Sequence, residues 1–248
     1  QLSFAQFHQI SGTGIRKDSS IYGIIGGAQV STSYSLEAYN QYFRDRETDA
    51  HYLPIPAKDC QEAIRIIQWL QESFHTMGFS ITSPFKTSLS EALELGSDAI
   101  NTICLHPQPL AGYHHVRRLS CFARWANTDL DALRASLAQL DVNCEDSIFI
   151  YGSGACAEAF VQYLVSSGYH SITLGGRNTE RVTYLRTKYS LSPSDPTSCQ
   201  LLINASSRLS FDEEADLPGF AKLIDLPYQN GKSSDLQKLA WKLKLPHV

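Results

Sequence analysis

The sequence predicts an α/β protein of two domains, and three observations carry that prediction. Short apolar, β-branched runs alternate with helical patterns along most of the 248 residues. Two of these runs, residues 21–25 and 147–151, end directly in glycine clusters, as strands that enter tight turns do. Polar residues follow several other runs, where open α/β sheets place their ligands. We expect a substrate-binding domain at residues 1–127, a nucleotide-binding domain at 128–230, and a tail, 231–248, that returns to the first domain.

Composition restricts the classes of function. A hydrophobic share of 43% and a charged share of 19% are ordinary for a soluble globular protein. The net charge of −4, without a polybasic run, gives no basic footprint for nucleic acid or an anionic membrane, so we expect neither as a partner. No apolar stretch approaches the roughly 20 residues of a membrane span, and no signal peptide is visible, which predicts a cytoplasmic protein.

The cysteines and the first residue carry two further expectations. Six cysteines are scattered without the spacing of a metal site, so we expect reduced structural thiols and no metal. The chain opens on Gln1 rather than methionine, which indicates a piece of a longer protein.

The first domain begins with a strand, a glycine pair and a hydroxyl-rich turn at residues 31–35. Its expected elements are a strand at 21–25, a helix from about 36 to 43, a strand within 51–57, a helix over 59–77 and a short strand ending at Ile81. The serines of the turn have two interpretations: a capping cluster, or a ligand site at the carboxyl end of a strand. By itself the pattern favours capping.

Lys86 lies just past the turn that Pro84 makes, where a side chain can point into a cleft. A single lysine is usually a solvated surface residue. Here Asn101 and Asp129 fall at similar strand ends, and the recurrence favours a functional site.

The second domain is built around residues 147–177, a strand-turn-helix-strand pattern. Its first turn matches the dinucleotide fingerprint G-x-G-x-x-A at Gly152, Gly154 and Ala157, with Ser153, Ala155 and Cys156 between them. The first glycine permits the turn, the second lets backbone N–H groups approach a pyrophosphate, and the small third residue lets the helix pack closely. An ordinary glycine-rich turn is the alternative, but the full context favours a Rossmann-type, doubly wound domain.

The second strand of this pattern ends in residues 175–177, Gly-Gly-Arg, without an acid. A carboxylate at that point would hold the ribose hydroxyls of NAD and repel a 2′-phosphate. The guanidinium of Arg177 suits a phosphate instead. NADP is therefore the expected cofactor.

Over residues 21–236 the chain resembles the shikimate dehydrogenase family, with the motifs in the family order. Ser33 and Ser35 resemble its S-x-S, whose hydroxyls hold the substrate carboxylate, and Asn40 falls on the asparagine that follows. Residues 80–86 resemble N-V-T-x-P-x-K. This resemblance implies that Lys86 is the catalytic lysine and that Thr82 contacts the substrate. It also implies that Asn101, in A-x-N-T, contacts the substrate and that Asp129, in N-T-D, is the catalytic aspartate.

The resemblance also covers the cofactor half. Gly152 to Ala157 resembles the family's glycine turn, Arg177 and Asn178 fall on the turn that reads the 2′-phosphate, and Asn204 and Ala205 fall on I-N-A. Residues 225–228 resemble D-x-x-Y, which implies that Tyr228 contacts substrate.

The activity implied by the resemblance is NADP-dependent interconversion of 3-dehydroshikimate and shikimate, in the biosynthesis of chorismate and aromatic amino acids. Lys86 and Asp129 would manage the proton of the reacting hydroxyl as a coupled pair, with Lys86 the better candidate for the shuttle. The leader before Ile21 resembles the junction behind a dehydroquinate dehydratase, so we expect that enzyme as a fused or associated partner.

Departures from the family pattern keep two alternatives open. Leu36 and Tyr39 replace a proline and a histidine beside the serines, which leaves quinate or another polyol acid as a possible substrate. Arg208 and Leu209 replace a glycine-methionine pair, and the family's closing helices have no counterpart after Val248. The second alternative is a dehydrogenase-like binding or regulatory module without turnover.

Overall fold

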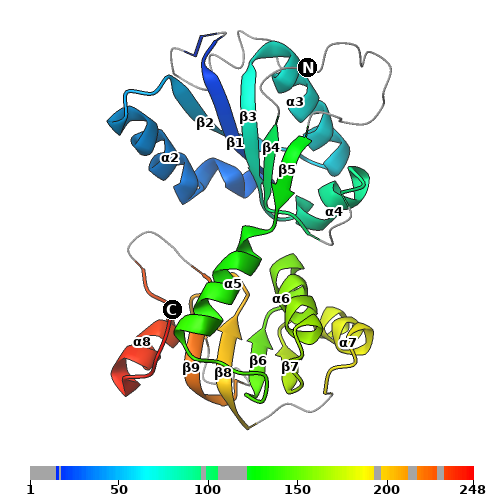
Figure 1. Ribbon diagram of the computed structural model, residues 1–248, viewed down its shortest axis with the longest axis vertical. Coiled ribbons are helices and arrows are strands. Elements are labelled where there is room, and N and C mark those ends of the chain that lie inside the picture. The colour runs from blue at the N-terminus through cyan, green and yellow to red at the C-terminus, as the bar shows by residue number, and fades with distance from the viewer. Residues whose placement is uncertain are drawn as a thin grey trace. The chain divides into compact units, whose positions relative to one another are not determined.

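The computed structural model describes residues 15–16, 18–95, 99–105, 122–192, 197–211, 217–227 and 232–248. The chain divides into two compact units, Gln1–Thr128 and Asp129–Val248, each with its own sheet (Figure 1). This confirms the two-domain α/β fold. None of the described helices is long and apolar enough to cross a membrane.

The first unit is built on a mixed five-stranded sheet in the order β2-β1-β3-β4-β5. Its elements are β1 (Ser20–Gly26), the 3-10 helix η1 (Ala28–Thr32), α2 (Tyr34–Asp45), β2 (Ala50–Pro56), α3 (Cys60–Ser73), β3 (His75–Ile81), α4 (Phe85–Ala92), β4 (Thr102–Leu105) and β5 (Phe122–Ala126). Strands β1, β2 and β3 are parallel, whereas β4 and β5 pair antiparallel. Because β2 and β3 lie on opposite sides of β1, the strand order reverses at β1, and ligands of open sheets bind at the carboxyl end of such a strand.

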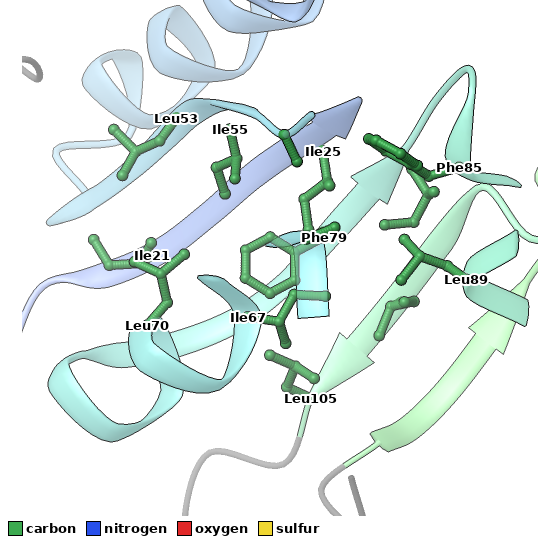
Figure 2. Packing of buried hydrophobic residues seen from close by; sticks show 14 of the residues in the cluster. Ile21, Ile25, Leu53, Ile55, Ile67, Leu70, Phe79, Phe85, Leu89 and Leu105 are labelled. Carbon is green, nitrogen blue, oxygen red and sulfur yellow. The ribbon is translucent and has the colours of Figure 1, made fainter. Parts of the chain in front are cut away.

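The core of the first unit lies between the sheet and α3. Alternation along β1 turns Ile21 and Ile25 to the same face as Phe79 of β3, and Ile67 and Leu70 of α3 pack there (Figure 2). The helix starts where the side chain of its N-cap residue, Asp59, accepts a hydrogen bond from a backbone N–H of the first turn.

Two helices in this unit differ from the prediction. Helix α3 ends at Ser73 rather than at residue 77, because His75 and Thr76 pair with β1 as the start of β3. Lys86 follows the turn at Pro84, as predicted, but it is the second residue of α4, a helix that the sequence did not predict.

The second unit is a four-stranded parallel sheet in the order β7-β6-β8-β9. Its elements are α5 (Thr128–Gln139), whose first residue falls in the first unit, β6 (Ile148–Tyr151), α6 (Ala155–Ser166), β7 (Ile172–Gly175), α7 (Thr179–Lys188), β8 (Ser198–Asn204), β9 (Gly219–Asp225) and α8 (Asp235–Leu243). The residues of β6 alternate between two cores. Ile148 and Ile150 pack with α5, α6 and α7, and Phe149 and Tyr151 pack with α8. Helices on both faces give the predicted doubly wound fold, with the strand order reversing at β6.

The tail belongs to the second unit, not to the first as predicted. Helix α8 buries Leu236 and Ala240 in a core that includes Leu223 of β9. The backbone of Leu223 also accepts a hydrogen bond from Val248 N at 3.1 Å and donates one to Pro246 O at 3.0 Å. The tail therefore covers the sheet that it has just left, because its apolar stripe matches the open face beside β9.

A buried polar cluster attaches α8 to this sheet. Asp225 of β9 is 9% exposed, and its carboxylate accepts hydrogen bonds from Asn204 Nδ2 at 2.7 Å and from the Ser234 hydroxyl. Ser234 also caps α8, accepting from Gln237 N at 3.0 Å. Burial raises the pKa of Asp225 above its ordinary value, although the two hydrogen bonds oppose the shift.

The raised pKa makes the stability of this unit depend on pH. A carboxyl group whose pKa is raised by folding stabilises the fold below its unfolded pKa, and that contribution is lost as pH rises through the folded pKa. Replacing Asp225 by asparagine removes the ionisation and puts an uncharged amide of the same shape in place of the carboxyl group. As the pH rises from 4 to 7, the free energy of unfolding of the wild type should therefore fall relative to that of Asp225→Asn. Urea unfolding and hydrogen exchange of the α8 amides measure this difference. A stability difference that is constant over this range, or that moves the other way, would contradict this origin of the raised pKa.

Candidate active site

In the first unit, the carboxyl ends of β1 and β3 lie close together at Gly26, which has no side chain. A Cβ atom at this position would lie 2.4 Å from Thr82 Cγ2 and 2.6 Å from Val30 Cγ1, so only glycine permits the approach. Gly27 N donates a hydrogen bond to Ser83 O at 3.1 Å across the same junction. Thr82, a predicted substrate contact, is thereby placed against η1, the turn that leads into the predicted carboxylate site.

The serines after η1 lie at the N-terminus of α2. Ser33 is the N-cap residue, yet its side chain makes no capping hydrogen bond. Ser33 and Ser35 are both half-buried. The capping interpretation favoured by the sequence is therefore not observed for Ser33. Hydroxyls beside the unpaired N–H groups and positive dipole end of a helix suit a carboxylate.

Asn40 has a structural role on the same helix. Its Nδ2 atom donates to Leu36 O and to Tyr52 O, both at 2.8 Å, and its Oδ1 accepts from Tyr52 N at 2.9 Å. The amide thus pairs with the backbone of the edge strand β2 as another strand would. Asn40 holds α2 on the sheet.

Lys86 and Asn101 are brought together by the backbone. Lys86, which is half-buried, accepts a hydrogen bond at its carbonyl oxygen from Ile100 N at 3.0 Å. Ile81 N, at the end of β3, donates to Asn101 O at 2.7 Å. The end of β3, the start of α4 and the residues before β4 therefore form one connected segment of the first unit.

The side chain of Asn101 binds the start of α5. Its Oδ1 accepts from Thr128 N, and its Nδ2 donates to Thr128 Oγ1, both at 2.9 Å. Asp129 is the next residue, half-buried in the first turn of that helix, and falls in the second unit. Asn101 thus precedes strand β4 rather than ending a strand as predicted, whereas Asp129 follows the end of β5, as predicted, and is the second residue of α5. Tyr228, the last predicted substrate contact, lies outside the described residues.

The glycine turn of the second unit has the geometry that a dinucleotide needs. Gly152 has a φ of 143°, and a Cβ atom there would lie 2.9 Å from the carbonyl of Ala205. At Gly154, the N-cap of α6, a Cβ atom would meet nothing within 4 Å, so the backbone borders open space. Ala157 is fully buried against the sheet. The three positions therefore match the turn, the phosphate approach and the close packing of the fingerprint.

The other residues of this turn present the start of α6. Ser153, Ala155 and Cys156 are half-buried, and Ala155 is the first residue of the helix. The backbone N–H groups in the first turn of a helix have no partner within it. A pyrophosphate placed beside Gly154 would accept hydrogen bonds from them, and it would meet the positive end of the α6 dipole.

Two arginines lie near the end of β7, Arg177 in the turn and Arg181 in the first part of α7, and they differ in their contacts. Arg177 is exposed, whereas Arg181 forms an ion pair with Glu158, a residue only 7% exposed. Asn178, expected to contact cofactor, is the N-cap of α7 and accepts a hydrogen bond from Arg181 N at 3.0 Å. Arg177 is therefore the arginine of this turn that is placed to meet a phosphate in solvent.

Asn204 was expected to contact the cofactor, but its side chain binds groups of the protein instead. It has no exposed surface. Its Nδ2 donates to Asp225 Oδ1 at 2.7 Å, and its Oδ1 accepts from Ser206 N at 3.2 Å and from the Ser206 hydroxyl at 2.7 Å. The amide therefore shapes the turn after β8 from within. Ala205, which is half-buried, supplies the backbone that packs against Gly152.

Comparison with known proteins agrees with this arrangement. Residues 25–103 match the model of the shikimate dehydrogenase substrate binding domain. A relative from Thermoplasma acidophilum, named shikimate dehydrogenase (NADP(+)), is 30% identical over 169 residues, which is 65% of this chain and 56% of the relative. One from Caldivirga maquilingensis, with the same name, is 27% identical over 66% of this chain and 57% of the relative. The chain thus spans a little over half the length of these curated relatives.

The fold agrees as well. The structure of shikimate 5-dehydrogenase from Thermus thermophilus, solved with NADP(H) and shikimate, superimposes with a TM-score of 0.66, covering 92% of this chain and 86% of that one at 17% identity. Residues 25–103 of the chain thus match the substrate binding domain of the shikimate dehydrogenase family, and the chain has the fold of a solved shikimate dehydrogenase.

Proposed function

We propose that this protein is an NADP-dependent oxidoreductase that interconverts 3-dehydroshikimate and shikimate. The observation that carries the proposal is the close approach at Gly26, where Thr82 lies against the turn that leads to Ser33. Both residues lie in the domain that matches the family model. The relatives named shikimate dehydrogenase (NADP(+)) support the same reaction.

The substrate would be held by the first unit. Ser33, Ser35 and the N-terminus of α2 would bind its carboxylate, because hydroxyl and backbone N–H groups there can donate to an anion. Thr82 and Asn101 would bind its ring hydroxyls, together with Tyr228. Such bonds discriminate strongly, since a ligand without the hydroxyl leaves a polar side chain unpaired.

The proton of the reacting hydroxyl would be managed by Lys86 and Asp129. An ammonium and a carboxylate that share one hydroxyl stabilise each other's charged form, so proton ownership belongs to the pair. In oxidation, Lys86 as the neutral amine would take the hydroxyl proton and become the ammonium, and in reduction this ammonium would return the proton to the oxygen. When bound, NADP supplies the hydride-accepting nicotinamide.

The cofactor would be held by the second unit. The open backbone at Gly154 and the start of α6 would bind the pyrophosphate, and the exposed Arg177 would bind the 2′-phosphate. Asn178 and Asn204 would act by fixing the α7 start and the turn after β8.

We also propose a cytoplasmic location and a metabolic partner. The five cysteines among the described residues form no disulfide, in keeping with a reducing compartment. A dehydroquinate dehydratase, fused or separate, would supply 3-dehydroshikimate. Fusion of this fold to another enzyme is known from a Clostridium acetobutylicum chorismate mutase/shikimate 5-dehydrogenase, which superimposes with a TM-score of 0.67.

Lys86→Ala tests the proposed chemistry. Loss of a general acid or base lowers kcat by about 10²- to 10⁴-fold, and NADP affinity should stay nearly unchanged because the lysine lies in the other unit. Steady-state kinetics with shikimate and fluorescence titration with NADPH measure the two effects. Lys58→Ala, which alters an exposed lysine of the same unit, is the matched control. An active Lys86→Ala enzyme would remove this lysine from the mechanism.

Arg177→Ala tests the choice of cofactor. Removing a charge-assisted contact to the 2′-phosphate should raise the KM for NADP about 10- to 100-fold, while the KM for NAD changes little. Arg134→Ala, at an exposed arginine of α5, should affect neither constant. Equal effects of Arg177→Ala on both cofactors would show that this guanidinium does not read the 2′-phosphate.

A further inference from the structure

Tyr52 makes a hydrogen bond that links two strands of the first sheet across a third. It lies on the edge strand β2, is 4% exposed, and donates from its hydroxyl to Ser80 Oγ of β3 at 2.7 Å. Strand β1 lies between the two, so the tyrosine side chain spans its width. Ser80 and Thr82 are two residues apart and lie on the same face of β3 and its extension.

The same tyrosine is bound to α2 at three points. Both backbone polar groups of Tyr52 are paired with the Asn40 amide, at 2.8 and 2.9 Å. Its ring is stacked on that of Tyr39, with centroids 4.6 Å apart and an interplanar angle of 25°. Tyr52 therefore connects α2 on one side with the end of β3 on the other.

These connections matter more than usual because α2 is weakly packed. None of its twelve residues is fully buried, so the apolar packing that normally fixes a helix on a sheet is limited here. Only partly buried residues, Leu36 and Phe43, pack from α2 against the small cluster of Ile24, Val30 and Tyr52. A few specific contacts must then decide where the N-terminus of α2 lies.

We propose that Tyr52 is a positioning residue that sets the separation between the two halves of the substrate site. One half is the start of α2, with Ser33 and Ser35, and the other is the end of β3, with Thr82 and then Lys86. The inference rests on the proposed function for the identity of the substrate. A shift of about 1 Å between such groups can cost 100-fold in rate, so a hydrogen bond that fixes their separation has a measurable effect.

Tyr52→Phe removes the hydroxyl alone and leaves the ring stack and the Asn40 pairing. We expect kcat/KM for shikimate to fall about tenfold, mainly through a higher KM for shikimate, with the KM for NADP within about twofold of wild type. Tyr42→Phe makes the same change at an exposed tyrosine of α2 and should alter neither constant. A KM for shikimate that is unchanged in Tyr52→Phe overturns the proposal.

Ser80→Ala and the double variant show whether the effect runs through the hydrogen bond. If it does, Ser80→Ala resembles Tyr52→Phe, and the double variant is no worse than either single one. Fully additive losses would mean that the two residues act separately, against the proposal.

Hydrogen exchange of the α2 amides tests the positioning without turnover. Tyr52→Phe should speed exchange in α2, and Tyr42→Phe should not. Should the wild-type protein fail to oxidise shikimate, the proposed function fails by itself, and exchange still decides whether Tyr52 fixes α2. Unchanged exchange in α2 would overturn that role.

Discussion

The arrangement of each unit depends on a glycine at the carboxyl end of its central strand. At Gly26 the missing side chain admits Thr82 and Val30, and at Gly152 it admits the backbone of Ala205. Both glycines lie where the strand order reverses, so each sheet converges on one point without a side chain in the way. Any larger residue would separate the end of its strand from its neighbour, and with it the groups that we propose to bind substrate or cofactor.

Polar side chains around these points serve two purposes. Asn40, Asn101 and Asn204 direct their amides at the protein's own backbone or side chains, and each joins segments that are distant in sequence. Ser33 leaves the expected capping bond unmade, and Arg177 is exposed. Asn40 and Asn204 therefore build the site, whereas Asn101, the Ser33 hydroxyl and the Arg177 guanidinium are groups that we propose to bind ligands.

Much of the fold could be predicted because local pattern and local structure agree. Strands β1 and β6 and helices α2 and α6 follow directly from the apolar periodicity and from the turn-forming residues beside them. The end of α3 could not be predicted, because the helical period continues by chance into residues that pair with β1. The eight-residue α4 was missed because it is short and follows a proline turn.

The site was less accessible to sequence because its hydrogen bonds join distant residues. Asn101 binds Thr128, and Asn204 binds Asp225, across 27 and 21 positions. The sequence shows where the asparagines lie along the chain, but it does not show that their amides bind other groups of the protein. The tail was misplaced for a similar reason, since only the open face beside β9 decides where α8 packs.

The most direct test of the account is the appearance of NADPH absorbance when the purified chain is mixed with shikimate and NADP. We expect NADPH to form, with a higher kcat/KM for shikimate than for quinate and a higher kcat/KM for NADP than for NAD. Cofactor binding without oxidation of either acid would contradict it and would indicate a binding or regulatory module. Preferential oxidation of quinate would show that the protein is a dehydrogenase whose substrate is quinate rather than shikimate.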